Sequence, residues 1–448
     1  MKLWDKGKNT DSIILNFTVG NDRELDMELA ASDVIASIAH VIMLESVKLL
    51  SADEKTRLIK ELSNLYDEIN SGVFSIEEGV EDIHSQVEKI LIKNLGETGK
   101  RVHTARSRND QVLVDLKLFY RKQTVLISGK VNELVRILIE KGQNNVHNLI
   151  PGYTHLQAAM PSSFGLWFGA YAESLVEDLM IHEGIFRYIN QNPLGSAAGY
   201  GSSFPINRDL TTRLLEFDDL HVNSINAQLS RGKTEKLICA GLGSIAGSLS
   251  KMAMDMTLFL SQNFGFIKLR DELTTGSSIM PHKKNPDVLE LIRAKCNRIS
   301  AVYNEVLLLT QNLPSGYHRD FQLLKEIIFP AYHELAGCLE MMIYVVNNLE
   351  ISENITEDEK YLYIFSVENV NEKVMKGIPF REAYAQVAQE IERGSFKRMT
   401  GVSYTHTGSI GNPGFEMIIK KLEAVWLRLE IDKFSSFEAR FIKKVKGN

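Results

Sequence analysis

The segment SINAQLSRGKTEKLICAGLGSIAGSLSKMAMDMTLFLSQ, from Ser224 to Gln262, decides the fold class. Its charges are confined to positions 231–236, Lys251 and Asp255, and small residues lie among the aliphatic ones. A helix that is apolar or small on nearly every side is expected to be buried on every side. As one 39-residue helix it would be roughly 58 Å long, longer than one compact domain. The segment therefore predicts a long central helix whose burial needs other subunits, and hence a homo-oligomer.

Proline is scarce, with 10 in 448 residues, and none occurs at 1–150, 206–280 or 331–378. Because proline breaks helix interiors, these spans permit long helices. Across 112–141, apolar residues recur at the i, i+3, i+4 spacing of an amphipathic helix. Nothing alternates strand with helix as a parallel sheet requires. The expected fold class is all-α.

Composition and charge exclude several classes of protein. The chain is 44% hydrophobic and 24% charged, as in ordinary globular proteins, and its net charge of −6 creates no basic field for nucleic acid. It shows neither the apolar core of a signal peptide at its start nor 18 uncharged apolar residues in a row. The three cysteines are widely spaced and form no disulfide or zinc pattern. We expect a cytoplasmic protein with no metal, no cofactor, and neither nucleic acid nor membrane as a partner.

The first of three polar segments that interrupt the helices is HTARSRNDQ at 103–111. Interruptions of a scaffold are where sites concentrate. Arg106, Arg108 and Asn109 form a dense set of donors suited to carboxylate recognition. An equally plausible interpretation is a helix start, with Ser107 or Asn109 as its N-cap.

The other two polar segments are PGYTHLQAAMP at 151–161 and TGSSIMPHKKNP at 275–286. The first holds His155 between two prolines, on a constrained loop; a lone histidine is more often structural unless it has a partner. The second combines hydroxyls with Lys283 and Asn285, which suits stabilisation of an oxyanion; the alternative is a loop with a solvated lysine pair. Together the segments predict general acid/base chemistry on a small anionic substrate. The chain lacks the GxSxG motif of a serine hydrolase, so the sequence does not support that class of enzyme.

These segments also carry a resemblance to a known family. GSSIMPHKKNP at 276–286 resembles the signature of the fumarase/aspartase superfamily of lyases. HTARSRNDQV at 103–112 and PGYTHLQ at 151–157 are similar to its argininosuccinate lyase branch. Further matches are EDIH at 81–84, LSR at 229–231 and YHRDFQLLK at 317–325. The resemblance implies reversible β-elimination of argininosuccinate to arginine and fumarate, a step of arginine biosynthesis.

The resemblance also implies a three-domain, mostly helical subunit whose central five-helix bundle assembles into the twenty-helix core of a homotetramer. It implies active sites shared between three subunits. With the breaks near residue 108 and at 350–360, we expect an N-terminal helical domain at 1–108. The central bundle is expected at 109–355 and a small, mostly helical C-terminal domain at 356–448.

In this reaction a weakly acidic C–H beside a carboxylate is deprotonated, and the resulting aci-carboxylate needs fixed positive charge and donors. By resemblance, Lys283, Asn285 and the backbone N–H groups of 276–279 supply them. Ser277 is the expected base, its oxyanion being stabilised by the same donors. Ser278 is the close alternative.

His155 is then the expected acid toward the leaving guanidinium nitrogen, tuned by Glu290 at the charge-relay position of the family. The reverse assignment, with His155 as base, stays open. By the same resemblance, the expected substrate-binding residues are Arg108, Asn109, Thr154, Asn285, Tyr317, Gln322, Lys325, Ser278, Asp82 and Arg231.

Some positions depart from the family pattern. His282 replaces the usual Gln and matches adenylosuccinate lyase, which motivates another succinyl-amine lyase as an alternative function. The stretch 17–22 does not align on the family's substrate-binding serine, and the Gly-rich loop at 405–413 is atypical. A second alternative is a catalytically silent, crystallin-like relative, but such a protein would not need the retained catalytic residues.

Overall fold

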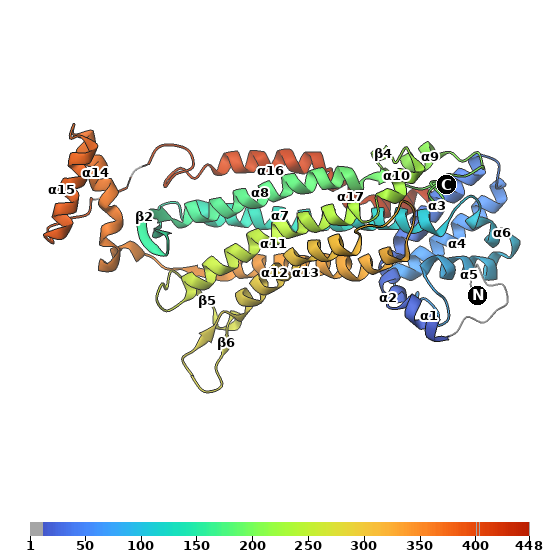
Figure 1. The fold of residues 1–448 in the computed structure, drawn as a ribbon, viewed down its shortest axis with the longest axis horizontal. Coiled ribbons are helices and arrows are strands. Elements are labelled where there is room, and N and C mark those ends of the chain that lie inside the picture. Colours follow the sequence, from blue (N-terminus) through green and yellow to red (C-terminus); the bar gives the residue numbers. More distant parts are fainter. Residues whose placement is uncertain (1–11, 400, 403, 448) are drawn as a thin grey trace.

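The computed structural model describes residues 12–399, 401, 402 and 404–447 as an elongated, mostly helical molecule (Figure 1). Five long helices run along its length and share one hydrophobic core. They are α7 (Arg108–Asn144), α8 (Phe164–Ile189), α11 (Lys233–Leu260), α12 (Asp287–Leu309) and α13 (Leu323–Asn348). The prediction of a mostly helical fold is confirmed.

The segment 224–262 is two helices, so the prediction of one 39-residue helix is wrong. Helix α10 (Ser224–Leu229) stops before α11, and Gly232 lies between them with φ +76°. Glycine adopts this left-handed conformation without steric cost. A Cβ at this position would also lie 2.9 Å from Cγ2 of Thr310. The break therefore follows from a backbone turn that only the fold reveals, and the 28 residues of α11 extend about 42 Å.

Helix α11 is buried on one side within the single chain. Ile238, Leu242, Ile245 and Leu249 are in the core, whereas 39% of Met254 is exposed. The stretch Ser224–Leu260 passes a length-and-composition test for crossing a membrane, as does Asp22–Ser46, and their tested windows are 50% and 78% buried. The first stretch contains α11 of the bundle, and the second contains α3 (Ala30–Ser46), which contributes to a separate core at one end of the molecule. Burial of α11 on every side is not achieved by one chain.

Small residues let α11 approach α8 closely, as the sequence pattern suggested. A Cβ on Gly241 would lie 2.5 Å from Cδ1 of Ile185 and 3.1 Å from Nε2 of His182. We expect Gly241→Ala to lower the free energy of unfolding by about 1–3 kcal/mol through overpacking. Thermal unfolding measures this effect. The control is Gly184→Ala on α8, where a Cβ meets nothing within 4 Å; equal stability of the two variants would contradict the prediction.

The N-terminal helices lie at one end of the bundle (Figure 1). They are α1 (Ser12–Val19), α2 (Asp22–Asp26), η1 (Met27–Leu29), α3 (Ala30–Ser46), α4 (Ala52–Asn70), α5 (Ile83–Leu95), α6 (Glu97–Lys100) and η2 (Arg101–His103). Of these, α3, α4 and α5 contribute to a second core. Helix α7 starts immediately after the N-terminal helices. Its first turns belong to this end of the molecule, where Val114 and Leu118 join the second core.

The C-terminal part reaches both ends of the bundle. After η5 (Ile355–Glu357) and η6 (Glu359–Phe365), α14 (Ser366–Met375) and α15 (Phe380–Glu392) lie at the end opposite the N-terminal helices (Figure 1). Helix α16 (Phe415–Leu429) then returns along α8, and α17 (Ile431–Ser435) and α18 (Phe437–Lys446) pack near α7, α3 and α4. The domain boundaries at 109 and 356 stay a prediction.

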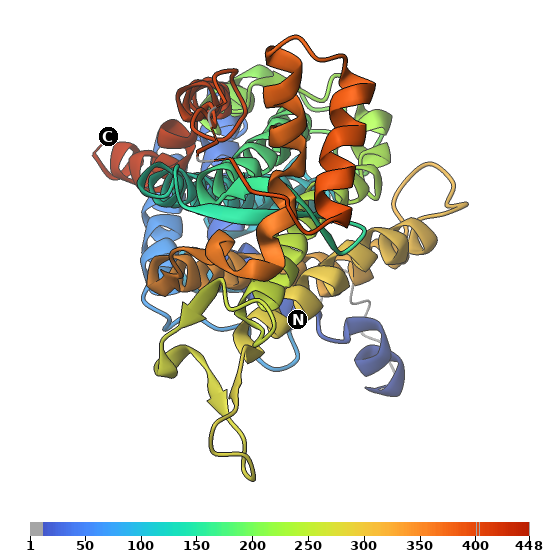
Figure 2. The ribbon, with the colours of Figure 1, turned by 90° about the vertical axis from the view of Figure 1, so that its left-hand side faces the viewer.

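Four two-stranded sheets connect the helices in the described part of the chain. The pair β3 (Gln191–Asn192) and β4 (Asp219–Leu220) is parallel, whereas β5 (Ile267–Leu269) and β8 (Leu349–Ile351) are antiparallel. The antiparallel pairs β1 (Leu149–Thr154) with β2 (Gln157–Ser163), and β6 (Thr275–Gly276) with β7 (Lys284–Asn285), carry the second and third polar segments. Figure 2 shows the β6–β7 loop projecting from the bundle.

Candidate active site

The first polar segment is both a helix start and part of a cavity. The N-cap of α7 is Ser107, whose backbone N–H donates to Oδ1 of Asp110 over 2.9 Å. The hydroxyl of Ser107 accepts from the backbone N–H of Asn109. Because Ser107 and Asp110 satisfy the cap, the side chains of Arg108 and Asn109 on the first turn are available for the cavity. The segment is therefore both the start of α7 and a source of donors for the cavity, so the two interpretations are compatible.

Seven predicted substrate-binding residues meet at one small cavity of about 90 Å³. They come from the start of α5, the first turn of α7, the α10–α11 break and the segment that leads into α13: Asp82, Arg108, Asn109, Arg231, Tyr317, Gln322 and Lys325. The sequence analysis missed the remaining lining residues Asp22, Asp26, Glu81, Val112 and Arg319. Glu81 stands in the quoted EDIH match, but nothing in the sequence distinguishes Asp22 or Asp26 from solvated acids.

Lys325 lies buried between two of the missed carboxylates. Its Nζ is 2.5 Å from Oδ1 of Asp22 and 2.5 Å from Oδ1 of Asp26. Burial disfavours the ammonium, but the charges of Asp26 and then Asp22 outweigh it and raise the pKa of Lys325. Burial also raises the pKa of Asp22 to about 6 against the opposing effect of Lys325. The three groups form one charged unit on the wall of the cavity.

Arg108 is held by three neighbours on its inner side. Its Nε lies 3.1 Å from Oδ2 of Asp82, its Nη1 donates to Oε2 of Glu81 over 3.2 Å, and its Nη2 donates to Oγ of Ser85 over 3.0 Å. A guanidinium has five N–H donors, so two are left for another partner. Glu81 also accepts from Arg319. Arg108 is therefore oriented before any ligand arrives.

Two further cavity residues contact backbone oxygens. Arg231 is buried, donates to the carbonyl of Phe321 over 2.9 Å and forms an ion pair with Glu235. Gln322 donates from Nε2 to the carbonyls of Thr18 and Val19 at the end of α1. The N-terminal helices thus form one side of the cavity.

The charge of the cavity is balanced. Four carboxylates face four cations across it: Asp22, Asp26, Glu81 and Asp82 against Arg108, Arg231, Arg319 and Lys325. Such a lining suits a ligand that carries both carboxylates and basic nitrogen groups. The cavity of the single chain is smaller than a typical ligand pocket of roughly 300–1,000 Å³.

The second polar segment forms the turn of the β1–β2 hairpin. His155 and Leu156 occupy the turn with φ +52° and +57°, and Thr154, His155 and Leu156 are all exposed. Hairpin turns of this kind normally use Asn or Gly, and a bulky residue at positive φ stores strain that clusters at functional sites. The expectation that His155 lies on a constrained loop is confirmed.

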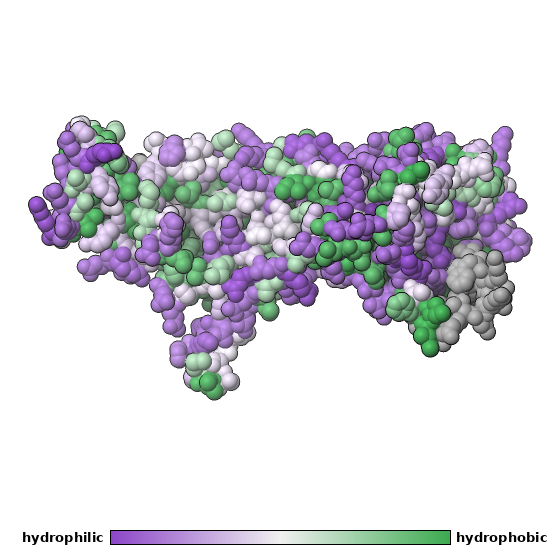
Figure 3. Space-filling model, in the orientation of Figure 1, coloured by the Kyte–Doolittle hydropathy of each residue, from purple (hydrophilic) through white to green (hydrophobic). Residues whose placement is uncertain are grey.

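The third polar segment is the loop between β6 and β7. Oγ of Ser277 accepts from the backbone N–H groups of Met280 at 3.1 Å and Ile279 at 3.4 Å. Ser278, Lys283 and Glu290, which is in the first turn of α12, are exposed, and Asn285 is half-buried. Figure 3 shows apolar residues at the loop tip, where 82% of Ile279 is exposed.

The three groups of predicted residues lie apart in the single chain. The hairpin with β2 is near one end of the bundle, α2 beside the cavity is near the other, and the β6–β7 loop projects sideways (Figure 1). His155 and Ser277 are absent from the residues that line the cavity. One chain does not bring its predicted catalytic and substrate-binding residues together.

The Lys325 cluster gives a stability prediction. Replacing one partner of a buried ion pair leaves uncompensated charge, so we expect Lys325→Met to lower the free energy of unfolding by about 3–5 kcal/mol. The control is Lys446→Met, whose pair with Asp67 is exposed and is worth less than about 1 kcal/mol. Urea denaturation measures both variants. Similar losses in the two would contradict the assignment of a buried charged unit.

Comparisons with known proteins agree on one family. The model of the family described as Lyase matches residues 5–301. The chain is 55% identical over 411 residues to the argininosuccinate lyase of Phocaeicola vulgatus, covering 92% of each chain. It is 51% identical to that of Parabacteroides distasonis, covering 98% of this chain and 99% of the relative.

Solved structures agree on the fold. An EDDS lyase in complex with formate has a TM-score of 0.76 at 21% identity, covering 98% of this chain and 95% of the other. The class II fumarase of Schistosoma mansoni has a TM-score of 0.69 at 15% identity, covering 92% and 95%. The fold is thus that of these lyases, and by its close similarity to the curated relatives the chain belongs to the argininosuccinate lyase family.

Proposed function

We propose that this chain cleaves argininosuccinate reversibly into arginine and fumarate, as a cytoplasmic carbon–nitrogen lyase of arginine biosynthesis without metal or cofactor. Curated relatives more than 50% identical bear the name argininosuccinate lyase. The charge-balanced cavity is the structural observation that carries the proposal. Argininosuccinate combines carboxylates with an ammonium and a guanidinium, and the four carboxylates and four cations of the cavity complement those groups.

The base in this proposal is Ser277. Removing a proton beside a carboxylate creates an aci-carboxylate, and an ordinary serine is too weak a base for that step. Support comes from the two backbone N–H groups that donate to Oγ of Ser277, since they would also stabilise its oxyanion. Lys283 and Asn285 from the same loop bind and neutralise the aci-carboxylate. Ser278 is the alternative base.

His155 gives a proton to the departing guanidinium nitrogen, and Glu290 tunes it. A strained, exposed turn presents His155 outward from its own subunit, which suits a residue that acts on a substrate held mainly by another chain. Kinetics of the Ser277→Ala, Ser278→Ala and His155→Asn variants distinguish these roles from the reverse ones, with His155 as base and Ser277 as acid.

The active form in this proposal is a homotetramer with a twenty-helix core and active sites shared between three subunits. The support is geometric. One chain holds His155, Ser277 and the cavity in separate places, and the cavity alone is too small for the substrate. Helix α11 also leaves apolar residues such as Leu237 and Met254 exposed, which association would cover.

Substrate specificity is tested by offering argininosuccinate and adenylosuccinate separately and following the ultraviolet absorbance of fumarate. The proposal expects fumarate from argininosuccinate only. His282, which matches adenylosuccinate lyase, is the reason for the second substrate. Fumarate from adenylosuccinate alone would replace the proposed function with the alternative one. Absence of fumarate from both would indicate a silent, crystallin-like protein.

A further inference from the structure

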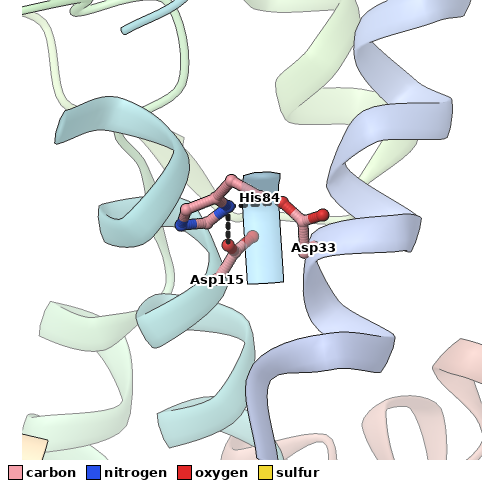
Figure 4. Close-up of side chains that lie close together, drawn as sticks. All are labelled: Asp33, His84 and Asp115. Carbon is pink, nitrogen blue, oxygen red and sulfur yellow. Dashed lines mark hydrogen bonds and ion pairs between the residues drawn. The ribbon is translucent and has the colours of Figure 1, made fainter. Parts of the chain in front are cut away.

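A buried cluster of Asp33, His84 and Asp115 lies behind the cavity and has no part in the mechanism above (Figure 4). Nδ1 of His84 is 2.8 Å from Oδ1 of Asp33 and 3.6 Å from Oδ2 of Asp115. Each of the three side chains is at most 2% exposed. They come from α3, α5 and α7, so the cluster connects three helices at the base of the site.

His84 is the nearest cation to these two carboxylates. Neither oxygen of Asp115, nor Oδ2 of Asp33, accepts a hydrogen bond within the part of the chain that the structure describes. A buried carboxylate without such donors needs a neighbouring positive charge. The 2.8 Å contact with Asp33 is a hydrogen bond in which Nδ1–H of His84 donates, and both the imidazolium and the neutral ring protonated at Nδ1 carry this proton.

The electrostatic surroundings favour this imidazolium. Burial disfavours the charged ring, but Asp33, then Asp115 and Asp82, outweigh burial and raise the pKa of His84 to about 9. The charged and titratable groups around the cluster are Asp26, Asp33, Asp82, Asp115, Arg106 and His103. Arg106 adds positive charge near both carboxylates but has a buried position of its own beside Ser37.

The effect of His84 extends to the cavity through Asp82. Asp82 is the N-cap of α5 and accepts from the backbone N–H of Ser85 over 2.8 Å. Burial opposes its ionisation, but the charge of His84, then that of Arg108, outweighs burial and lowers the pKa of Asp82. The other oxygen of Asp82 lies 3.1 Å from Nε of Arg108. His84, Asp82 and Arg108 thus form a row of alternating charge.

We propose that His84 is a positioning residue: its buried contacts with Asp33 and Asp115 fix the start of α5, where Asp82 and Ser85 orient Arg108 for a carboxylate of the substrate. This inference rests on the proposed function. Removing the charge of His84 breaks the ion pairs that tie α5 to α3 and α7, so Asp82 and Ser85 no longer hold the guanidinium of Arg108 in one place. The loss therefore affects binding of substrate more than the chemical step.

The same donor atoms, all within 4.8 Å of one another, also resemble a set of metal ligands. A metal would require the lone pair of Nδ1 that the hydrogen bond to Asp33 occupies with a proton. Arg106 adds a further positive charge that opposes a cation there. The geometry therefore favours a proton on Nδ1 of His84 and not a metal ion bound there.

The first test compares His84→Gln with the wild type. We expect KM for argininosuccinate to rise roughly 10- to 100-fold, the loss typical of a charged hydrogen bond, with a smaller change in kcat. The control is His182→Gln, because His182 is equally buried but burial lowers its pKa to about 4 and it has no carboxylate partner among its described contacts. An unchanged KM in a folded His84→Gln protein would overturn the proposal.

A second variant covers the case in which His84→Gln does not fold. His84→Gln with Asp115→Asn removes the buried imidazole together with one of its two carboxylate partners, so less charge is left uncompensated, while α5 still lacks its ion pairs to α3 and α7. We expect thermal stability to recover and KM to stay raised. Recovery of both would show a merely structural role and overturn the proposal.

The pH dependence gives a readout that a structural role would not produce. Since the pKa of His84 is raised from 6.5 to about 9, its proton stabilises the folded chain fully below pH 6.5. That contribution disappears as the pH rises through about 9. KM of the wild type should rise in the same range, and KM of the double variant should not. Identical pH profiles would count against the proposal.

Two measurements separate the possible failures. If the wild type releases no fumarate from argininosuccinate, the proposed function fails, and calorimetric binding of succinate and of arginine to the same variants still tests His84.

Incubation with zinc followed by removal of free ion and elemental analysis tests the metal. If the wild type retains one zinc per chain and His84→Gln retains none, the assignment of His84 as an imidazolium would be overturned.

Discussion

Replacing Ser277 with alanine is expected to lower kcat by about 10²- to 10⁴-fold, the contribution of a well-placed general base, while KM changes little. The physical reason is that Ser277 acts on the reacting C–H and not on the groups that bind the substrate. Its Oγ accepts from the N–H groups of Ile279 and Met280, and alanine removes the oxygen without disturbing these exposed donors. Steady-state kinetics with argininosuccinate measures both constants.

The matched control is Ser278→Ala, which changes the neighbouring hydroxyl on the same exposed loop. It should retain most of the wild-type kcat. If Ser277→Ala keeps its activity and Ser278→Ala loses it, Ser278 is the base. If both remain active while His155→Asn is inactive, the base is His155 and the proposed roles are reversed.

Mixing two inactive variants is expected to restore activity. In the proposed tetramer, His155→Asn and Ser277→Ala each disable every site, but a hybrid would contain some sites that receive His155 from one chain and Ser277 from another. This follows from the separate positions of the β1–β2 turn and the β6–β7 loop in one subunit (Figure 1). The measurement is fumarate release after mild dissociation and reassociation of the mixture.

The control for this experiment mixes Ser277→Ala with Lys283→Met, two variants that each alter the β6–β7 loop. Every chain in such a hybrid has an altered loop, so no site contains both an intact loop and His155. No activity should therefore return. Verified hybrids of the first pair without activity would contradict sharing of sites between subunits.

Much of the cavity could be predicted from the sequence. Its motif residues lie at or beside helix starts, such as Asp82 before α5 and Arg108 on the first turn of α7. The family resemblance named these residues, and for Arg108 and Asn109 the dense polar segment at 103–111 pointed to the same place, because motifs and capping patterns depend on neighbouring residues only. The mostly helical fold followed in the same way from helical periodicity and the distribution of proline.

Other parts of the site depend on contacts between distant segments. The sequence analysis did not identify Asp22 or Asp26, because only the fold places them 2.5 Å from Lys325, some 300 positions away along the chain. It matched His84 within EDIH without assigning it a role, since its meaning comes from Asp33 and Asp115 on two other helices.

The sequence by itself therefore determined that the chain is mostly helical, and it predicted which polar segments carry the chemistry. Helical periodicity, capping and chemical motifs are properties of short stretches, and each can be read from one stretch alone. The tertiary structure decided where Gly232 divides the central helix, which charges are paired, and that His155, Ser277 and the cavity lie apart in one chain. These features depend on burial and long-range electrostatics, which exist only once distant segments have packed together.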